Sequence, residues 1–171
     1  AFIGIGLMGL PMTKNLLKAG YSLRIFNRTP EKVESLREHK AKITKSIKEV
    51  VSEADVIITM LTDDEAVNAV MGNEDFLNNI KSGSTVIDMS SVKPETAKFH
   101  GTKLNLKKIN YLDAPVSGGT IGAEEASLAI MVGGEKKIFE DHLDIFKTMG
   151  NPTLVGPLAS GQISKLANQI I

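Results

Sequence analysis

A glycine pattern near the start of the chain limits its fold more than any other feature. The segment from Gly4 to Gly9 reads G-x-G-x-x-G and lies between an apolar run, Phe2 to Ile5, and a segment with helical spacing of apolar residues, Leu10 to Ala19. Such glycines permit a tight turn, close approach of a pyrophosphate to the backbone and close helix–strand packing. A helix that starts there offers free N–H groups to an anion. This context predicts a dinucleotide-binding βαβ unit. The predicted contacts in the turn are Gly4, Gly6, Leu7, Met8 and Gly9.

The rest of the chain alternates between strand-like and helix-like segments. Short apolar runs predict strands at residues 2–5, 21–26, 56–61, 85–89, 109–113, 128–132 and 153–155. Helical spacing, prolines and capping residues predict helices at 10–19, 135–147 and 161–171, with others beginning near residues 30, 62 and 94. Alternation of this kind is typical of the α/β class. The expected architecture is a Rossmann-like, doubly wound and mostly parallel sheet with helices on both faces.

Composition excludes several other classes of protein. The 171 residues contain 20 Lys and Arg against 20 Asp and Glu, so the chain has no basic surplus for nucleic acid or an acidic membrane. The absence of Cys excludes disulfides, zinc–thiolate sites and thiol catalysis. No apolar run approaches the roughly 20 residues of a membrane helix, and no secretory signal is recognisable, so a cytoplasmic location is expected. The acidic run Asp63 to Glu65 is interpreted as the start of a helix, and no metal site is predicted.

The residues after the second predicted strand favour NADP over NAD. An NAD site places Asp or Glu at this position to bind the ribose hydroxyls, whereas here the sequence reads Asn27-Arg28-Thr29. Arg28 can form charge-assisted bonds with a 2′-phosphate and can stack on the adenine. Thr29 and the helix start that follows it add donors for the same anion. NADP is therefore the expected cofactor, with NAD still possible.

Four stretches, taken together, resemble the β-hydroxyacid dehydrogenase family, which includes 3-hydroxyisobutyrate dehydrogenases and tartronate semialdehyde and glyoxylate/succinic semialdehyde reductases. The residues 2–12 are similar to its cofactor signature, and 113–119 (DAPVSGG) to its substrate-binding segment. The residues 130–134 are similar to the strand that follows, and 161–169 (GQISKLANQ) to its catalytic helix. The resemblance implies an oxidoreductase that transfers a hydride between NAD(P) and a small hydroxy acid or semialdehyde that carries a carboxylate.

The resemblance also implies roles for individual residues. Lys165 would be the catalytic acid/base, which protonates the alkoxide as a carbonyl is reduced. Asn168 lies on the same helical face and would orient the amine or bind the substrate oxygen. The substrate carboxylate would be bound by Ser117, Gly118 and Gly119, since a hydroxyl and successive N–H groups form an anion nest. On the opposite side of this helix, an apolar stripe is expected to pack against the sheet; it comprises Ile163, Leu166 and Ile170.

The remaining cofactor contacts are expected at other strand ends. Met60 and Leu61 resemble family positions that flank the dinucleotide, and Ser91 resembles the position near the nicotinamide. Thr96 is a further candidate. Each also has a simpler interpretation, because Met60 and Leu61 are ordinary core residues and Ser91 can cap a helix.

The expected organisation is an NAD(P)-binding domain over residues 1–160 and the start of an interdomain catalytic helix over 161–171. In the family an all-helical domain follows; it is expected to be absent from this chain, which alone is expected to have little turnover. A full-length protein is expected to form a homo-oligomer. The alternatives are a non-catalytic dinucleotide-binding module, a 6-phosphogluconate dehydrogenase-like enzyme, in which a His-Asn pair would follow the lysine, and an imine reductase-like enzyme, which typically lacks the lysine.

Overall fold

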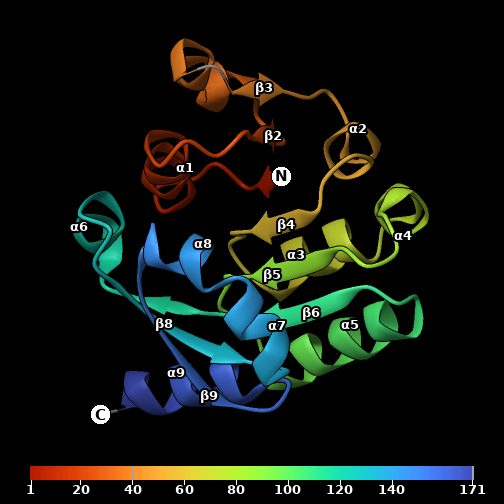
Figure 1. Cartoon of the computed structure of the whole chain (residues 1–171), viewed down its shortest axis with the longest axis vertical. Helices are drawn as coiled ribbons and strands as arrows, with labels where there is room; N and C mark the ends of the chain where they lie inside the picture. The colour runs from red at the N-terminus through yellow and green to blue at the C-terminus, as the bar shows by residue number, and fades with distance from the viewer. Residues whose placement is uncertain (40, 171) are drawn as a thin grey trace.

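A computed structural model describes residues 1–39 and 41–170 of the chain (Figure 1). Its strands are β1 (Phe2–Ile3), β2 (Arg24–Phe26), β3 (Lys42–Ile43), β4 (Val56–Thr59), β5 (Thr85–Asp88), β6 (Asn110–Asp113), β7 (Val116–Ser117), β8 (Leu128–Gly133) and β9 (Gly150–Gly156). Its helices are α1 (Gly9–Lys18), the 3-10 helix η1 (Pro30–His39), α2 (Ile47–Val51), α3 (Asp64–Met71), α4 (Glu74–Asn79), α5 (Pro94–Leu106), α6 (Gly119–Glu124), α7 (Lys136–Asp141), α8 (Leu143–Lys147) and α9 (Ser160–Ile170).

The described strands form one mostly parallel sheet. Their order is β3-β2-β1-β4-β5-β6-β8-β7, and β9 pairs with β8. The strands from β3 to β6 are all parallel, whereas β8 is antiparallel to both β6 and β7. Figure 1 shows β3 and β2 at one end of the molecule and β8, β9 and α9 at the other. The prediction of a Rossmann-like, mostly parallel sheet is confirmed.

Helices cover both faces of the sheet because the strand residues alternate between two apolar clusters. In β1, Phe2 belongs to one cluster and Ile3 to the other. Ile58 and Ile57 of β4 divide in the same way, as expected from the two-residue period of a strand. The first cluster includes residues of α1, η1, α6 and α8, and the second includes residues of α2, α3, α4 and α5. Strands buried on both faces explain the continuous apolar runs in the sequence.

The parallel strands bring four chain turns to one edge of the sheet, here called the carboxyl edge. It comprises the residues that follow β1, β2, β4 and β5. In an open α/β sheet, ligands bind at this edge. The predicted cofactor residues at these strand ends are therefore neighbours in space although they are far apart in the sequence.

Several sequence-based predictions need correction. The helix expected at 135–147 is broken at His142, whose Nδ1 lies 2.7 Å from the Ile138 carbonyl oxygen. The segment after Pro30 is a 3-10 helix, in which the buried Val33 and Leu36 share a face because that helix has three residues per turn. The helix expected near residue 62 is capped by Asp63, whose side chain accepts from the Ala66 N–H. Within the described ranges, the sequence analysis also missed β3, β7, α2, α4 and α6.

The apolar stripe of α9 was wrongly expected to pack on the sheet. Ile163, Leu166 and Ile170 are 57%, 46% and 86% exposed. The helix is instead buried at Gly161 and Gln162 in its first turn. A Cβ at position 161 would lie 2.4 Å from the Met131 carbonyl oxygen, so only glycine allows this close crossing.

Among the described residues, none of the helices combines the length and the apolar character needed to span a membrane.

The turn between β1 and α1 is as closely packed as the glycine pattern predicts. Gly4 has a φ of +99°, and a Cβ on Gly9 would lie 2.0 Å from the Gly4 carbonyl oxygen. By contrast, a Cβ on Gly6 would have no atom within 4 Å, so the backbone there is open to a ligand. Gly4 and Gly9 are therefore needed for packing, and Gly6 leaves space for a ligand.

Gly9→Ala should lower the free energy of unfolding by about 1–3 kcal/mol, because the added methyl group has no room beside the Gly4 carbonyl. Gly6→Ala is the matched control and should change it by less than about 0.5 kcal/mol. Urea denaturation of both variants measures the difference. Equal destabilisation by the two substitutions would contradict this packing.

Candidate functional site

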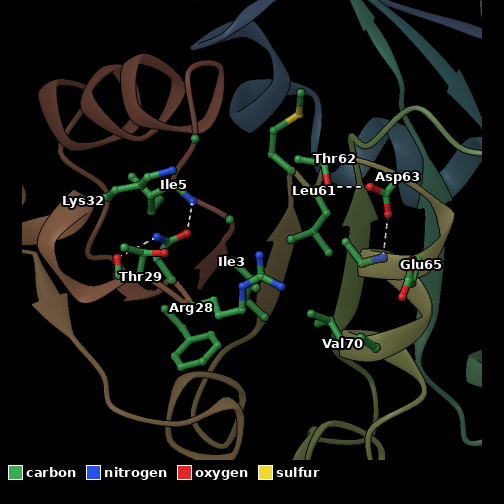
Figure 2. A pocket seen from close by; sticks show the side chains of 17 residues that line it. Ile3, Ile5, Arg28, Thr29, Lys32, Leu61, Thr62, Asp63, Glu65 and Val70 are labelled. Carbon is green, nitrogen blue, oxygen red and sulfur yellow. Dashed lines mark hydrogen bonds between the residues drawn. The ribbon is translucent and has the colours of Figure 1, made fainter.

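A cavity of about 440 Å³ lies at the carboxyl edge, between the ends of β1, β2 and β4 and helix α3 (Figure 2). Seven of the predicted cofactor residues line it: Gly4, Gly6, Asn27, Arg28, Thr29, Met60 and Leu61. Leu7, Met8 and Gly9 continue from this lining to the start of α1; Leu7, before the helix, is 84% exposed. The structure thus brings the glycine turn and the Asn-Arg-Thr segment to one cavity.

Asn27 fixes the shape of the cavity floor. Its Oδ1 accepts from the Ile5 N–H at 2.9 Å, and its Nδ2 donates to the Thr29 carbonyl oxygen at 2.8 Å. One side chain therefore ties the glycine turn to the segment after β2. This role explains an amide at position 27, because both a donor and an acceptor are required.

Charged side chains of both signs line the cavity. Arg28 and Lys32 lie on the side of β2 and η1, and Asp63 and Glu65 lie at the start of α3. Figure 2 shows the guanidinium of Arg28 reaching into the space between these two sides. The pKa of Asp63 is below its ordinary value because the Ala66 N–H and the Thr62 hydroxyl donate to its carboxylate, with a smaller effect from the charge of Arg28.

The sequence analysis did not identify Lys32 or the α3 residues as part of this cavity. Lys32 lies four residues after Arg28, a spacing that could have suggested a second cation beside it. The apolar wall formed by α3 could be recognised only from the fold, because it depends on how α3 packs beside β4. The additional lining residues are Ile3, Ile5, Phe26, Lys32, Thr62, Asp63, Glu65, Ala66, Ala69 and Val70.

The two candidates after β5 lie outside this lining. Ser91 is exposed in the loop that follows β5, and it does not cap α5, whose N-cap residue is Lys93. Thr96 lies in the first turn of α5, where its hydroxyl donates to the Asp64 carboxylate. Thr96 therefore connects α5 to α3, and its predicted contact with the cofactor stays a prediction.

Two of the predicted substrate and catalytic residues, Ser117 and Asn168, come together in the part of the sheet beyond β6. Ser117 ends β7, and Gly118 and Gly119 follow with φ angles of +138° and +62° at the start of α6. The Nδ2 of Asn168 on α9 donates to the Ser117 Oγ at a long 3.5 Å. Lys165 is half-buried one turn earlier on the same helix. The later part of α9 therefore lies beside Ser117, which was expected to bind the substrate carboxylate.

Two buried carboxylates lie behind these loops, and the sequence analysis identified neither as functional. Asp88 accepts from the Thr59 hydroxyl, the Ser90 N–H and the Tyr111 hydroxyl at 2.9, 3.1 and 3.3 Å. Burial nevertheless raises the pKa of Asp88 to about 6. Burial also raises the pKa of Asp113.

Metal-binding clusters of three or more His, Cys, Asp or Glu side chains are absent from residues 1–39 and 41–170. The acidic group at the start of α3 is accounted for by capping and by its bonds to α5.

These features define the chain as an α/β domain with the dinucleotide-binding architecture. Residues 1–158 match the family model described as the NAD binding domain of 6-phosphogluconate dehydrogenase. The chain belongs to this family, and the resemblance to β-hydroxyacid dehydrogenases is confirmed by its relatives.

Two curated relatives and one solved structure illustrate the similarity. The chain is 40% identical to 2-hydroxy-3-oxopropionate reductase of Escherichia coli, with 99% of the chain and 59% of the relative covered. It is 38% identical to the NAD-dependent L-serine dehydrogenase of Pseudomonas aeruginosa, with 98% and 57% covered. A structure of Mycobacterium tuberculosis 3-hydroxyisobutyrate dehydrogenase with L-serine superposes with a TM-score of 0.94 at 34% identity, covering 99% of this chain and 58% of that one. The chain thus spans under two thirds of the length of each.

Proposed function

We propose that this chain is the cofactor-binding part of an NADP-preferring oxidoreductase that interconverts a small carboxylate-bearing hydroxy acid and its semialdehyde or oxo form. The observation that carries the proposal is the arrangement of the carboxyl edge. The glycine turn and Arg28 line one cavity there, while Ser117, in the segment that follows the parallel strand β6, lies against Asn168 of α9. The relatives named for 2-hydroxy-3-oxopropionate and 3-hydroxyisobutyrate support this substrate class.

The residues present fit a dinucleotide. The open space at Gly6 gives a pyrophosphate access to the backbone N–H groups at the start of α1. The side chains of Leu61, Ala66 and Val70 form an apolar wall that suits the adenine ring. When bound, the nicotinamide would supply or take up the hydride.

The preference for NADP rests on the charges in the cavity. Arg28 and Lys32 both line the cavity and would bind a 2′-phosphate, and an arginine–phosphate pair is among the stronger charge-assisted contacts. Asp63, which could instead bind a ribose hydroxyl, already accepts from the Ala66 N–H and the Thr62 hydroxyl. The Pseudomonas relative is named as NAD-dependent, so the proposed preference rests on the residues of this cavity and not on family membership.

The catalytic proposal assigns the proton to Lys165. Its Nζ would protonate the alkoxide oxygen during reduction and remove the hydroxyl proton during oxidation. Asn168 would orient the substrate oxygen or the amine, and its contact with Ser117 connects it to the site proposed for the substrate carboxylate. The Ser117 hydroxyl and the N–H groups of Gly118 and Gly119 would bind that carboxylate.

Arg28→Ala should remove most of the preference for NADPH. The parent chain should bind NADPH at least about tenfold more tightly than NADH, a difference of about 1.4 kcal/mol. The matched control is Arg37→Ala, because Arg37 is an exposed arginine on η1 that pairs with Glu34 outside the cavity. Calorimetric titration of the three proteins measures both affinities. Equal affinities of the parent for the two cofactors would reject NADP preference.

Lys165→Ala should lower kcat by about 10²–10⁴, the usual contribution of a general acid. The assay uses a protein of the relatives' length that carries these 171 residues, with NADPH and glyoxylate or the succinic, tartronate or methylmalonate semialdehyde. NADPH affinity should be unchanged. Lys137→Ala is the control, because Lys137 pairs with Asp141 on the exposed surface of α7. A variant at position 165 that turns over normally would refute the assignment, and a parent without turnover would favour a non-catalytic module.

A further inference from the structure

Helix α9 carries Lys165 and Asn168, yet its contact with the sheet is concentrated in its first turn. Gly161 and Gln162 are buried there, whereas no later residue of the described helix is buried. Apart from the long contact of Asn168 with Ser117, the direction in which α9 leaves the sheet, and thus where Lys165 lies, is therefore set by the groups that hold this turn.

One of these groups is Asp113, at the end of β6. Its Oδ1 accepts from the Ala159 N–H at 2.8 Å, and its Oδ2 accepts from the Gln162 N–H at 3.0 Å. A Cβ on Gly133 would lie 2.5 Å from that Oδ1, and a Cβ on Gly161 would lie 2.8 Å from the Oδ2. Gly133 and Gly161 thus enclose the Asp113 carboxylate. The enclosed carboxylate fixes the start of α9 relative to β6 and β8.

The second group is the side chain of Gln162, which is 1% exposed. Its Oε1 accepts from the Val92 N–H at 3.1 Å, and its Nε2 donates to the Ser90 carbonyl oxygen at 2.8 Å. Both partners are backbone groups of the loop after β5, 70 and 72 residues away in the sequence. The pair of bonds requires one donor and one acceptor, which an amide has and a carboxylate lacks.

The loop held by Gln162 also reaches the cofactor cavity. The Ser90 Oγ accepts from the N–H of Leu61, which lines that cavity, at 2.9 Å. The Ser90 N–H donates to the buried Asp88, and Ser91 is the next residue along the loop. A continuous set of hydrogen bonds therefore leads from the cavity wall through residues 90–92 to the first turn of α9.

We propose that Gln162 is a positioning residue that ties the helix carrying Lys165 to the loop carrying Ser91. The proton donor and the cofactor side of the site are then held as one unit, with Asp113 fixing the helix start and Gln162 fixing its direction. Lys165 lies three residues after Gln162, so it neighbours Gln162 on the helix surface. The expected effect of Gln162 on turnover rests on the proposed function, whereas its expected effect on the mobility of α9 does not.

Gln162→Glu tests the inference because it preserves size and shape. The ionised side chain keeps an acceptor for the Val92 N–H and loses the donor to the Ser90 carbonyl. When protonated, the introduced carboxyl group has a donor again. Burial should raise its pKa, as should the Asp113 carboxylate on the N–H of residue 162 and the Asp88 carboxylate on the Ser90 N–H. The bond should therefore return at mildly acidic pH. The control is Gln169→Glu on the exposed end of α9.

The first measurement is amide hydrogen exchange in the 171-residue chain, expressed as the ratio of variant to parent at each pH. At pH 8, residues 90–92 and 162–168 should exchange together about tenfold faster in Gln162→Glu, and the ratio should approach one near pH 5. Gln169→Glu should give a ratio near one throughout. Unchanged exchange at pH 8, or a ratio independent of pH, would overturn the inference.

The second measurement is turnover in a protein of the relatives' length. Gln162→Glu should lower kcat about tenfold at pH 8 with NADPH affinity unchanged, and kcat relative to the parent should recover as the pH falls. Loss of NADPH affinity together with kcat would overturn the positioning role and indicate general disorder of the fold. A parent without turnover would reject the proposed function, while the exchange result would still decide whether Gln162 holds α9.

Discussion

The close approach of backbone to backbone at glycines is the constraint on which the structure depends. Between β1 and α1, Gly9 packs against the Gly4 carbonyl, so α1 can begin close to the end of β1. The sheet is buried on both faces by this and the other helices, which leaves its carboxyl edge as the place where loops can carry polar groups. The cavity with Arg28 forms at that edge because β1, β2 and β4 end side by side.

A second close approach at glycines, between the start of α9 and the sheet, sets the position of α9. Gly161 and Gly133 leave just enough room for the Asp113 carboxylate between the helix start and the sheet. The β1–α1 turn and the start of α9 are far apart in the sequence, but hydrogen bonds from Leu61 through Ser90 to Gln162 connect the two regions. The proposed cofactor site and the proposed proton donor therefore share one buried polar framework, and the framework explains why polar side chains occur in an otherwise apolar interior.

The sequence predicted the fold class, the glycine turn and a helix start near residue 62 because these depend on local patterns, although the cap itself lies one residue later, at Asp63. It failed for α9, whose apolar stripe faces outward, because the helix contacts the sheet through Gly161 and Gln162 instead of through large side chains. Short elements such as β3 and α2 were missed because a few residues give no measurable period. Lys32 and Asp88 take their roles from partners that are distant in the sequence, so no local signal identifies them. Asp113 and Gln162 lie within stretches that resemble the family, but the bonds that they form follow only from the fold.

The central claim is that the carboxyl edge binds the dinucleotide through the glycine turn and the cavity that contains Arg28. Mapping of backbone amide chemical shifts during titration of the chain with NADP⁺ tests this claim most directly. The largest changes should occur at residues 4–9, 27–32 and 60–70, with smaller changes in the loop 90–92. Changes centred instead on the opposite edge of the sheet, where Ser22 and Asp55 line a second cavity, or no saturable change at all, would contradict the account.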